Sequence, residues 1–124
     1  MRDTMMHDDA GILRIVLPAT LTAPELDRIV AALTELERSA AVCPDRMVDM
    51  SGVARFRVGF EEIFAAAETR RTHPPRNPIR SAFVAATPVQ IGFARMFQTL
   101  NDHPRVTLRI FPDTATALAW LKEG

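Results

Sequence analysis

The sequence predicts an α/β fold with a mainly parallel sheet and about four helices. Two observations indicate this class. Apolar segments with the pattern of strands take turns along the chain with longer segments whose apolar residues recur at helical spacing. Residues that commonly begin helices, such as Thr22 and Thr87 with a proline close behind each, stand at the changes from strand to helix. The order β-α-β-α-β-α-β-α implies parallel strands joined by right-handed crossovers.

Length and composition limit the possible roles. The 124 residues suit one domain, so we expect residues 1–124 to fold together, with residues 1–10 loose or forming a short edge strand. The formal net charge of zero argues against a nucleic-acid partner, because such proteins are usually basic. A single cysteine, Cys43, excludes an intramolecular disulfide and a cysteine-based zinc site. Without a signal peptide or a long apolar run, we expect a cytoplasmic protein with no transmembrane segment.

The first predicted strand and helix have clear patterns. Residues 12–17 alternate between two faces, as in a half-buried strand. Thr22 and Glu25 have the spacing of a capping box, so a helix should run from there to about residue 41. Its apolar stripe consists of Leu26, Ile29, Val30, Leu33 and Leu36. Glu37 falls outside this stripe and is expected on the solvent side.

The second strand and helix follow a short loop. Residues 46–50 form the strand, and Asp49, Ser51 and Gly52 form the turn behind it. A helix is predicted over residues 59–72, with an apolar stripe of Phe60, Ile63, Phe64 and Ala67. We therefore expect Phe60 to be buried rather than exposed.

The last half of the chain repeats the pattern. Residues 79–86 are apolar on both faces, which indicates a central strand covered on both sides. Thr87 should cap a third helix with a stripe of Val89, Phe93, Met96, Phe97 and Leu100. Residues 105–111 form the last strand, and a closing helix begins at Asp113 or Thr114 with Trp120 beside its buried stripe.

The turn between the second strand and second helix is the candidate binding site, because backbone N–H groups point outward at such turns. Its candidate residues for binding a partner or an anion are Asp49, Ser51, Arg55, Arg57, Gly59 and Phe60. Asp49 either serves the site or bonds its own turn. Ser51 lacks the G-x-S-x-G surroundings of a nucleophile. Arg55 and Arg57 either receive an anion or are simply solvated.

Two further groups have alternative interpretations. Phe93, Met96 and Phe97 either line an apolar ligand pocket or pack in the core. The positive residues in the last turn of the second helix and just after it could bind an acidic partner or lipid headgroups, but a complement to the helix dipole is favoured. These residues are Arg70, Arg71, His73, Arg76 and Arg80.

Three segments resemble the STAS-like superfamily and its SpoIIAA-like branch. They are VDMSGV at residues 48–53, GILRIVLPATLTAPELDRIVAAL at residues 11–33 and RIFPDTATALAWL at residues 109–121. The resemblance implies a mixed sheet of four to five strands with helices mainly on one face, and a regulatory or binding role without catalysis. In anti-sigma-factor antagonists of this superfamily, a serine at the start of the second helix is phosphorylated. Here Phe56-Arg57-Val58-Gly59 stands in that place and keeps only the glycine.

Two functions remain open from the sequence. The first is a regulatory protein-interaction module, expected to be a homodimer, with residues 55–60 and the second helix as the contact surface. The second is a small carrier or sensor of an apolar or anionic, lipid-like ligand, because SpoIIAA-like proteins without the serine also resemble CRAL-TRIO lipid-binding domains. We expect no enzyme, cofactor or metal, because the sequence lacks a nucleophile-base pair, paired carboxylates and a cofactor fingerprint.

Overall fold

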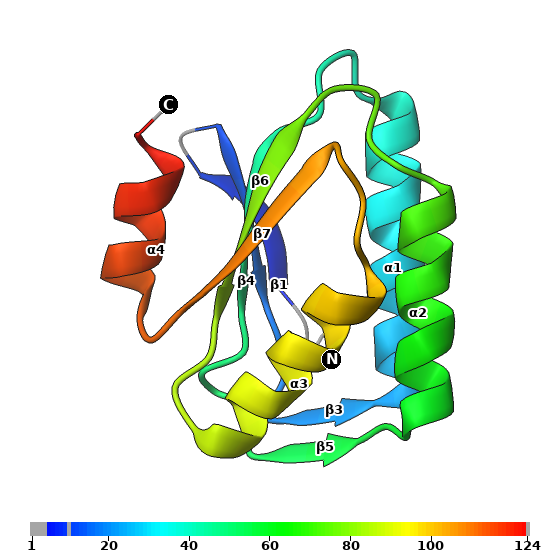
Figure 1. Cartoon of the computed structure of the whole chain (residues 1–124), viewed down its shortest axis with the longest axis vertical. Helices are drawn as coiled ribbons and strands as arrows, with labels where there is room; N and C mark the ends of the chain where they lie inside the picture. The colour runs from blue at the N-terminus through cyan, green and yellow to red at the C-terminus, as the bar shows by residue number, and fades with distance from the viewer. Residues whose placement is uncertain (1–4, 10, 124) are drawn as a thin grey trace.

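The computed structural model describes residues 5–9 and 11–123, with side chains from residue 11 onward (Figure 1). Its strands are β1 (Met5–Asp9), β2 (Ile12–Val16), β3 (Thr20–Thr22), β4 (Asp45–Asp49), β5 (Arg55–Arg57), β6 (Ile79–Val84) and β7 (Val106–Phe111). Its helices are α1 (Ala23–Ser39), α2 (Phe60–Thr72), α3 (Pro88–Leu100) and α4 (Thr114–Leu121). The predicted alternation of strands and helices is confirmed, and the short strands β3 and β5 are added to it.

The main sheet is mixed and mostly parallel, as predicted. Its strand order is β1-β2-β4-β6-β7, in which β1 is antiparallel to β2 and the other neighbours are parallel. Gly11 precedes β2 with a φ of +80°, a conformation that glycine adopts without strain. The strands β3 and β5 pair with each other in a separate two-stranded parallel sheet. Such short strands carry too little pattern to be recognised in the sequence.

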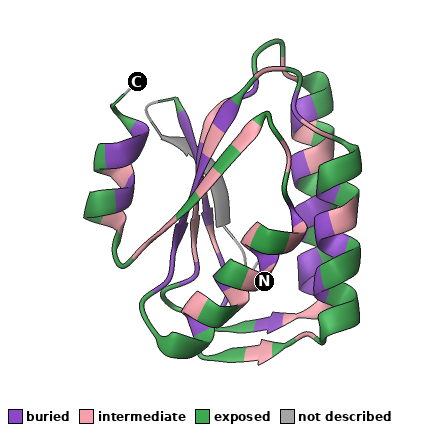
Figure 2. Cartoon of the chain, viewed as in Figure 1, coloured by how far each residue is buried: buried purple, intermediate pink, exposed green. Residues whose placement is uncertain are grey.

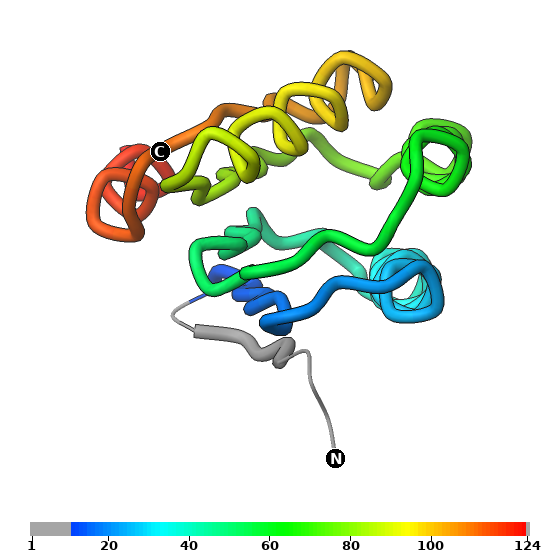
Figure 3. The backbone as a smooth tube through the Cα atoms, turned by 90° about the horizontal axis from the view of Figure 1, so that it is seen from below, coloured from blue at the N-terminus to red at the C-terminus, as the bar shows by residue number. Residues whose placement is uncertain are grey.

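The strand order explains why three helices share one face of the sheet. From β2 to β4, β6 and β7 each crossover advances in the same direction, so right-handed connections place α1, α2 and α3 on the same side. Figures 1 and 3 show α1 and α2 next to one another, with α3 beside them. No described strand follows α4, which packs on the opposite face against β4 and β6.

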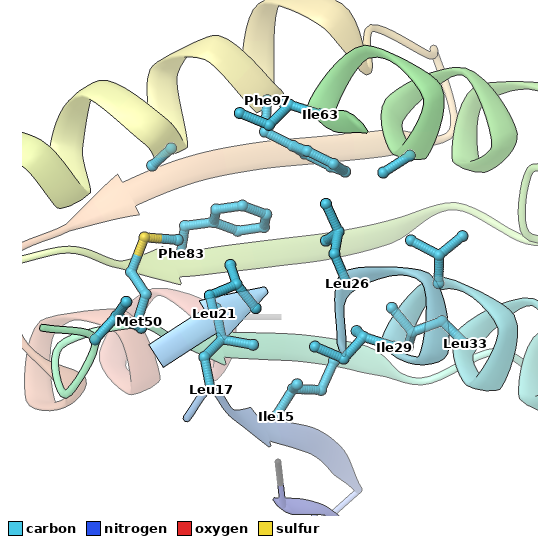
Figure 4. Packing of buried hydrophobic residues seen from close by; sticks show 14 of the residues in the cluster. Ile15, Leu17, Leu21, Leu26, Ile29, Leu33, Met50, Ile63, Phe83 and Phe97 are labelled. Atoms are coloured by element: carbon cyan, nitrogen blue, oxygen red, sulfur yellow. The ribbon is translucent and has the colours of Figure 1, made fainter. Parts of the chain in front are cut away.

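Two hydrophobic clusters lie on the two faces of the sheet, and Figure 2 shows their buried positions. The larger cluster lies between the sheet and α1 to α3. There the ring of Phe83 on β6 faces that of Phe97 on α3, with 5.7 Å between ring centroids, and Leu26 of α1 points toward them (Figure 4). The smaller cluster lies under α4 and includes Met47 of β4 and the buried Trp120.

The predicted helix starts are confirmed. The hydroxyl oxygen of Thr22 accepts a hydrogen bond from the backbone N–H of Glu25 at 3.3 Å. Thr87 and Gln90 form a complete capping box at α3. Asp113 caps α4 by accepting from the N–H of Thr116 at 2.8 Å, and this backbone bond is the main cause that lowers the pKa of Asp113.

Three apolar residues assigned to buried stripes are exposed instead. The exposed fractions are 59% for Phe60, 47% for Phe64 and 67% for Val89. In α2 the buried apolar residues are smaller and include Ile63 and Ala67. Because residues three apart are displaced by about 60° around a helix, the row of Phe60 and Phe64 runs along the flank of this buried row. The prediction that Phe60 is buried is therefore wrong.

A buried charge cluster joins α1, α2 and β4. The carboxylate of Glu37 accepts from Nη1 of Arg46 and, at 2.6 Å, from Nη2 of Arg70. Arg70 also donates to the hydroxyl of Thr34 at 3.2 Å. The exposed fractions of Glu37, Arg46 and Arg70 are only 6%, 5% and 4%. The expectation that Glu37 faces solvent is wrong, because Glu37 lies one turn after Leu33 and continues the buried row of α1.

We predict that Glu37→Gln strongly destabilises the protein. Two buried arginines would then lack their shared counter-charge, and removing one partner of a buried ion pair typically costs about 3–5 kcal/mol. Urea unfolding followed by circular dichroism measures the change. The matched control is Glu35→Gln on the same helix, because Glu35 forms an exposed pair with Arg38 and should leave the midpoint nearly unchanged. Equal effects of the two substitutions would contradict this account.

Candidate functional site

The turn after β4 is organised by Asp49. Its Oδ1 atom accepts from the backbone N–H of Ser51 at 2.9 Å and from the Ser51 hydroxyl at 2.6 Å. This is the side-chain-to-backbone pattern of an Asx turn, in which the carboxylate takes the place of a backbone acceptor. Ser51 is exposed, but its hydroxyl is already directed at a carboxylate. Asp49 and Ser51 therefore stabilise the conformation of this turn.

Gln90 connects this turn to the start of α3 by hydrogen bonds. The side chain is buried, with an exposed fraction of 2%. Its carbonyl oxygen accepts from the N–H groups of Ala86 at 2.8 Å and Thr87 at 3.2 Å. Its amide nitrogen donates to the carbonyl oxygens of Ser51 at 3.2 Å and Val53 at 3.0 Å. Sequence reasoning missed this role, although the spacing from Thr87 to Gln90 was the signal of a capping box.

The strand β5 presents two arginines to solvent. Its residues alternate, so Arg55 and Arg57 are exposed while Phe56 between them is half-buried. The ring of Phe56 stacks on Phe93 of α3 with 4.8 Å between centroids. Pairing with β3 on one side and this ring contact on the other hold the strand in place. Both guanidinium groups are therefore displayed on an anchored segment.

The N-terminus of α2 already has acidic partners. The N–H of Gly59 donates to Oε1 of Glu62 at 2.6 Å, and Glu61 lies in the same first turn. A Cβ atom at Gly59 would lie 2.8 Å from that Glu62 oxygen, which is closer than Cβ atoms normally come. An anion arriving at this helix end would meet carboxylates where it needs N–H donors.

Phe60 and Phe64 stack on each other at the start of α2. Their ring centroids are 6.1 Å apart, and both rings are largely exposed. Together with Arg55 and Arg57 they follow one continuous stretch from β5 into α2 (Figure 1). We call these four residues the Arg–Phe surface. The structure thus brings Arg55, Arg57, Gly59 and Phe60 onto one segment and keeps Asp49 and Ser51 on the turn fastened to α3.

A small cavity lies between the sheet and the helices α1 to α3. Its volume is about 60 Å³. Phe93 and Phe97 line it, whereas Met96 is half-buried against the core outside the lining. The walls are mainly apolar, but Arg46, Arg70 and Ser81 also border the space. Sequence analysis named Arg70 only as part of the positive cluster, and it missed Arg46 and Ser81 because both belong to strands assigned from their apolar neighbours.

The predicted positive cluster after α2 does not form one surface. Arg70 is buried on Glu37, and Arg71 pairs with Glu68 at 2.5 Å. Arg76 donates to the carbonyl oxygen of Arg38 at 2.8 Å. Arg80 lies on the other side of the sheet, with its guanidinium carbon 5.1 Å from the centroid of the Trp120 ring. The arginines are spread over α2, the loop after it and β6, so each of them contacts a different part of the fold.

One further property concerns membranes. Among residues 5–9 and 11–123, no helix combines the length and the apolar character that crossing a bilayer requires.

Solved structures of other proteins identify the fold of this chain. No protein-family model matches the chain, and no curated protein is significantly similar to it. A solved structure from Shewanella loihica PV-4, an uncharacterized DUF3478-family protein with a SpoIIAA-like fold, aligns with a TM-score of 0.64 at 14% identity over 95% of this chain and 91% of that one. An anti-sigma-factor antagonist (STAS) domain protein from Planctomyces limnophilus aligns with a TM-score of 0.58 at 16% identity over 95% of this chain and 97% of that one. The chain therefore has the SpoIIAA-like fold that STAS domains share, as the sequence resemblance implied.

Proposed function

We propose that this protein is a non-enzymatic regulatory module of the cytoplasm that binds another protein through its Arg–Phe surface. The observation that carries the proposal is the exposed Phe60–Phe64 stack on the segment that directly follows the exposed Arg55 and Arg57. The fold supports it, because one protein with a similar fold is described as an anti-sigma-factor antagonist. Regulation by protein contact is thus a role that this architecture can serve.

The chemistry of the Arg–Phe surface favours a protein partner. Aromatic and arginine side chains dominate the binding energy of protein interfaces, because they bury large areas and form charge-assisted hydrogen bonds. The two phenylalanine rings expose apolar area to water, and a partner that buries this area would gain hydrophobic free energy of binding. The matching partner has an apolar pocket for the rings and carboxylates placed to meet Arg55 and Arg57.

The turn chemistry supports a module that works without phosphorylation at this site. The Ser51 hydroxyl donates to the carboxylate of Asp49, so a phosphate on Ser51 would lie beside a negative charge. At the start of α2, Glu62 occupies the N–H of Gly59, where an added phosphate would be repelled. We therefore propose constitutive partner binding, without a phosphate-controlled switch.

The lipid-carrier alternative has less support. The cavity of about 60 Å³ is small beside the roughly 300–1,000 Å³ of typical sites for drug-sized ligands. The predicted homodimer remains a competing occupant of the Arg–Phe surface. A double substitution of Phe60 and Phe64 by alanine tests this alternative, because a homodimer that uses both rings would dissociate when they are removed.

We predict that the double substitution Phe60→Ala and Phe64→Ala weakens partner binding by at least tenfold without unfolding the protein. Both rings are exposed in the free protein, so their loss removes contact area with little change in the core. A photo-crosslinking residue at position 64 identifies the partner, and calorimetry with that purified partner gives the affinity. Val89→Ala is the matched control, because Val89 is an exposed apolar residue on α3. Equal affinity of the double variant would remove the Arg–Phe surface from consideration.

We also predict that Arg57→Glu weakens the same complex and reduces its salt dependence. A carboxylate at this position would repel the acidic groups of the partner, and surface charges act mainly on the association rate. Stopped-flow association at several salt concentrations measures the effect. Arg95→Glu on the exposed side of α3 introduces the same charge change elsewhere. Similar slowing by both substitutions would indicate general electrostatics rather than a specific contact.

In contrast, Ser51→Ala should leave folding and partner affinity nearly unchanged. Asp49 keeps its bond to the backbone N–H of residue 51, so the turn retains an acceptor for that group. Thermal unfolding and the calorimetric titration described above test both points. A complete loss of binding on this substitution alone would restore the phosphorylation hypothesis.

A further inference from the structure

The cavity between the sheet and α1 to α3 has an unusual polar end. Arg46 on β4 and Ser81 on β6 are direct neighbours in the parallel register, so both side chains point to the same face of the sheet. Arg70 approaches from α2, and the buried Asn101 closes α3 near the same space. The remaining walls are apolar and include Phe83 and residues of α1.

The charge at this end is unbalanced. Glu37 is the carboxylate that meets both Arg46 and Arg70, so the cluster contains two positive charges and one negative charge. Each guanidinium has about five N–H donors, more than the carboxylate of Glu37 and the hydroxyl of Thr34 can accept. Burial, and then the nearby charge of Arg70, lower the pKa of Arg46, as expected for a positive charge that lacks full compensation. A second anion would relieve this imbalance.

Ser81 supplies an independent observation. Its exposed fraction is 1%, and its hydroxyl oxygen has no hydrogen-bond partner within the part of the chain that the structure describes. Buried hydroxyl groups almost always have a partner, because an unmade hydrogen bond is costly in the interior. This hydroxyl borders the cavity next to Arg46. It is placed to donate to a molecule that occupies the space.

We propose that this cavity is a binding site for a short-chain monocarboxylate, with the carboxylate group at Arg46, Arg70 and Ser81 and the alkyl chain among the apolar walls. The size fits a molecule of this class. One water molecule needs about 10–15 Å³ of such cavity volume, so about 60 Å³ holds roughly four to six heavy atoms. Acetate and propionate have this size, an anionic end and an apolar end. The proposal goes beyond protein binding at the Arg–Phe surface and does not depend on it.

The first test is a titration of the full chain with propionate, followed by ¹H–¹⁵N NMR. Ligands of so few atoms bind weakly, so we expect saturation in the high-micromolar to millimolar range. The shifted amides should centre on Arg46 and Ser81. Propionamide has the same shape without the charge and should bind at least tenfold more weakly, and sodium chloride at equal ionic strength should produce no saturable shifts. Equal binding of propionamide, no saturable response, or shifts centred on Arg55 and Arg57 would overturn the proposal.

The second test uses variants that keep the protein folded. Ser81→Ala removes a hydroxyl that has no partner among the described residues, so stability should be retained while propionate affinity falls about tenfold. Ser81→Val places a larger side chain in the cavity, which reduces its free volume and should abolish binding. Ser51→Ala is the matched control, because it removes an exposed serine hydroxyl that is not part of the cavity lining. Unchanged propionate affinity in Ser81→Ala and Ser81→Val would show that the carboxylate does not bind at this end of the cavity.

Discussion

The structure depends on the buried carboxylate of Glu37. This one group holds Arg46 of the sheet and Arg70 of α2 while belonging to α1 itself. A buried ion pair adds a directional constraint to the apolar packing, because displacement of one partner would leave a charge unpaired away from water. The cluster thus sets where α1 and α2 lie. Since Arg46 and Arg70 also border the cavity, the same cluster determines the chemistry of the space enclosed beneath the helices.

The fold could be predicted largely from local patterns. Capping residues such as Thr22 and Thr87 mark helix starts because their bonds are made within a few residues, so the sequence contains the whole interaction. The pair β3 and β5 could not be found, since three-residue strands depend on a distant partner. The prediction also failed at Glu37, which continues the buried row of α1 although its charge suggested a solvent-exposed position. The counter-charges come from Arg46 and Arg70, which lie 9 and 33 residues away on other elements.

In the candidate site, too, roles that depend on local contacts could be predicted from the sequence, and roles that depend on distant contacts could not. Asp49 and Ser51 form a turn whose hydrogen bonds span two residues, and the alternative of a turn aspartate was available from the sequence. The role of Gln90 required knowledge that α3 lies against this turn. Exposure of Phe60 likewise depends on which flank of α2 meets α1, and helical spacing cannot specify that. Residues that act across the fold were therefore the ones that sequence reasoning missed.

The location of the single tryptophan has an experimental consequence. Trp120 is the only tryptophan of a chain without tyrosine, and the guanidinium carbons of Arg80 and Arg109 lie 5.1 and 5.7 Å from the centroid of its ring. Intrinsic fluorescence therefore reports the docking of α4 on its own face of the sheet, whereas the cavity and the Arg–Phe surface involve the helices of the opposite face. A fluorescence transition that precedes the loss of circular dichroism would mark α4 as a separately unfolding unit.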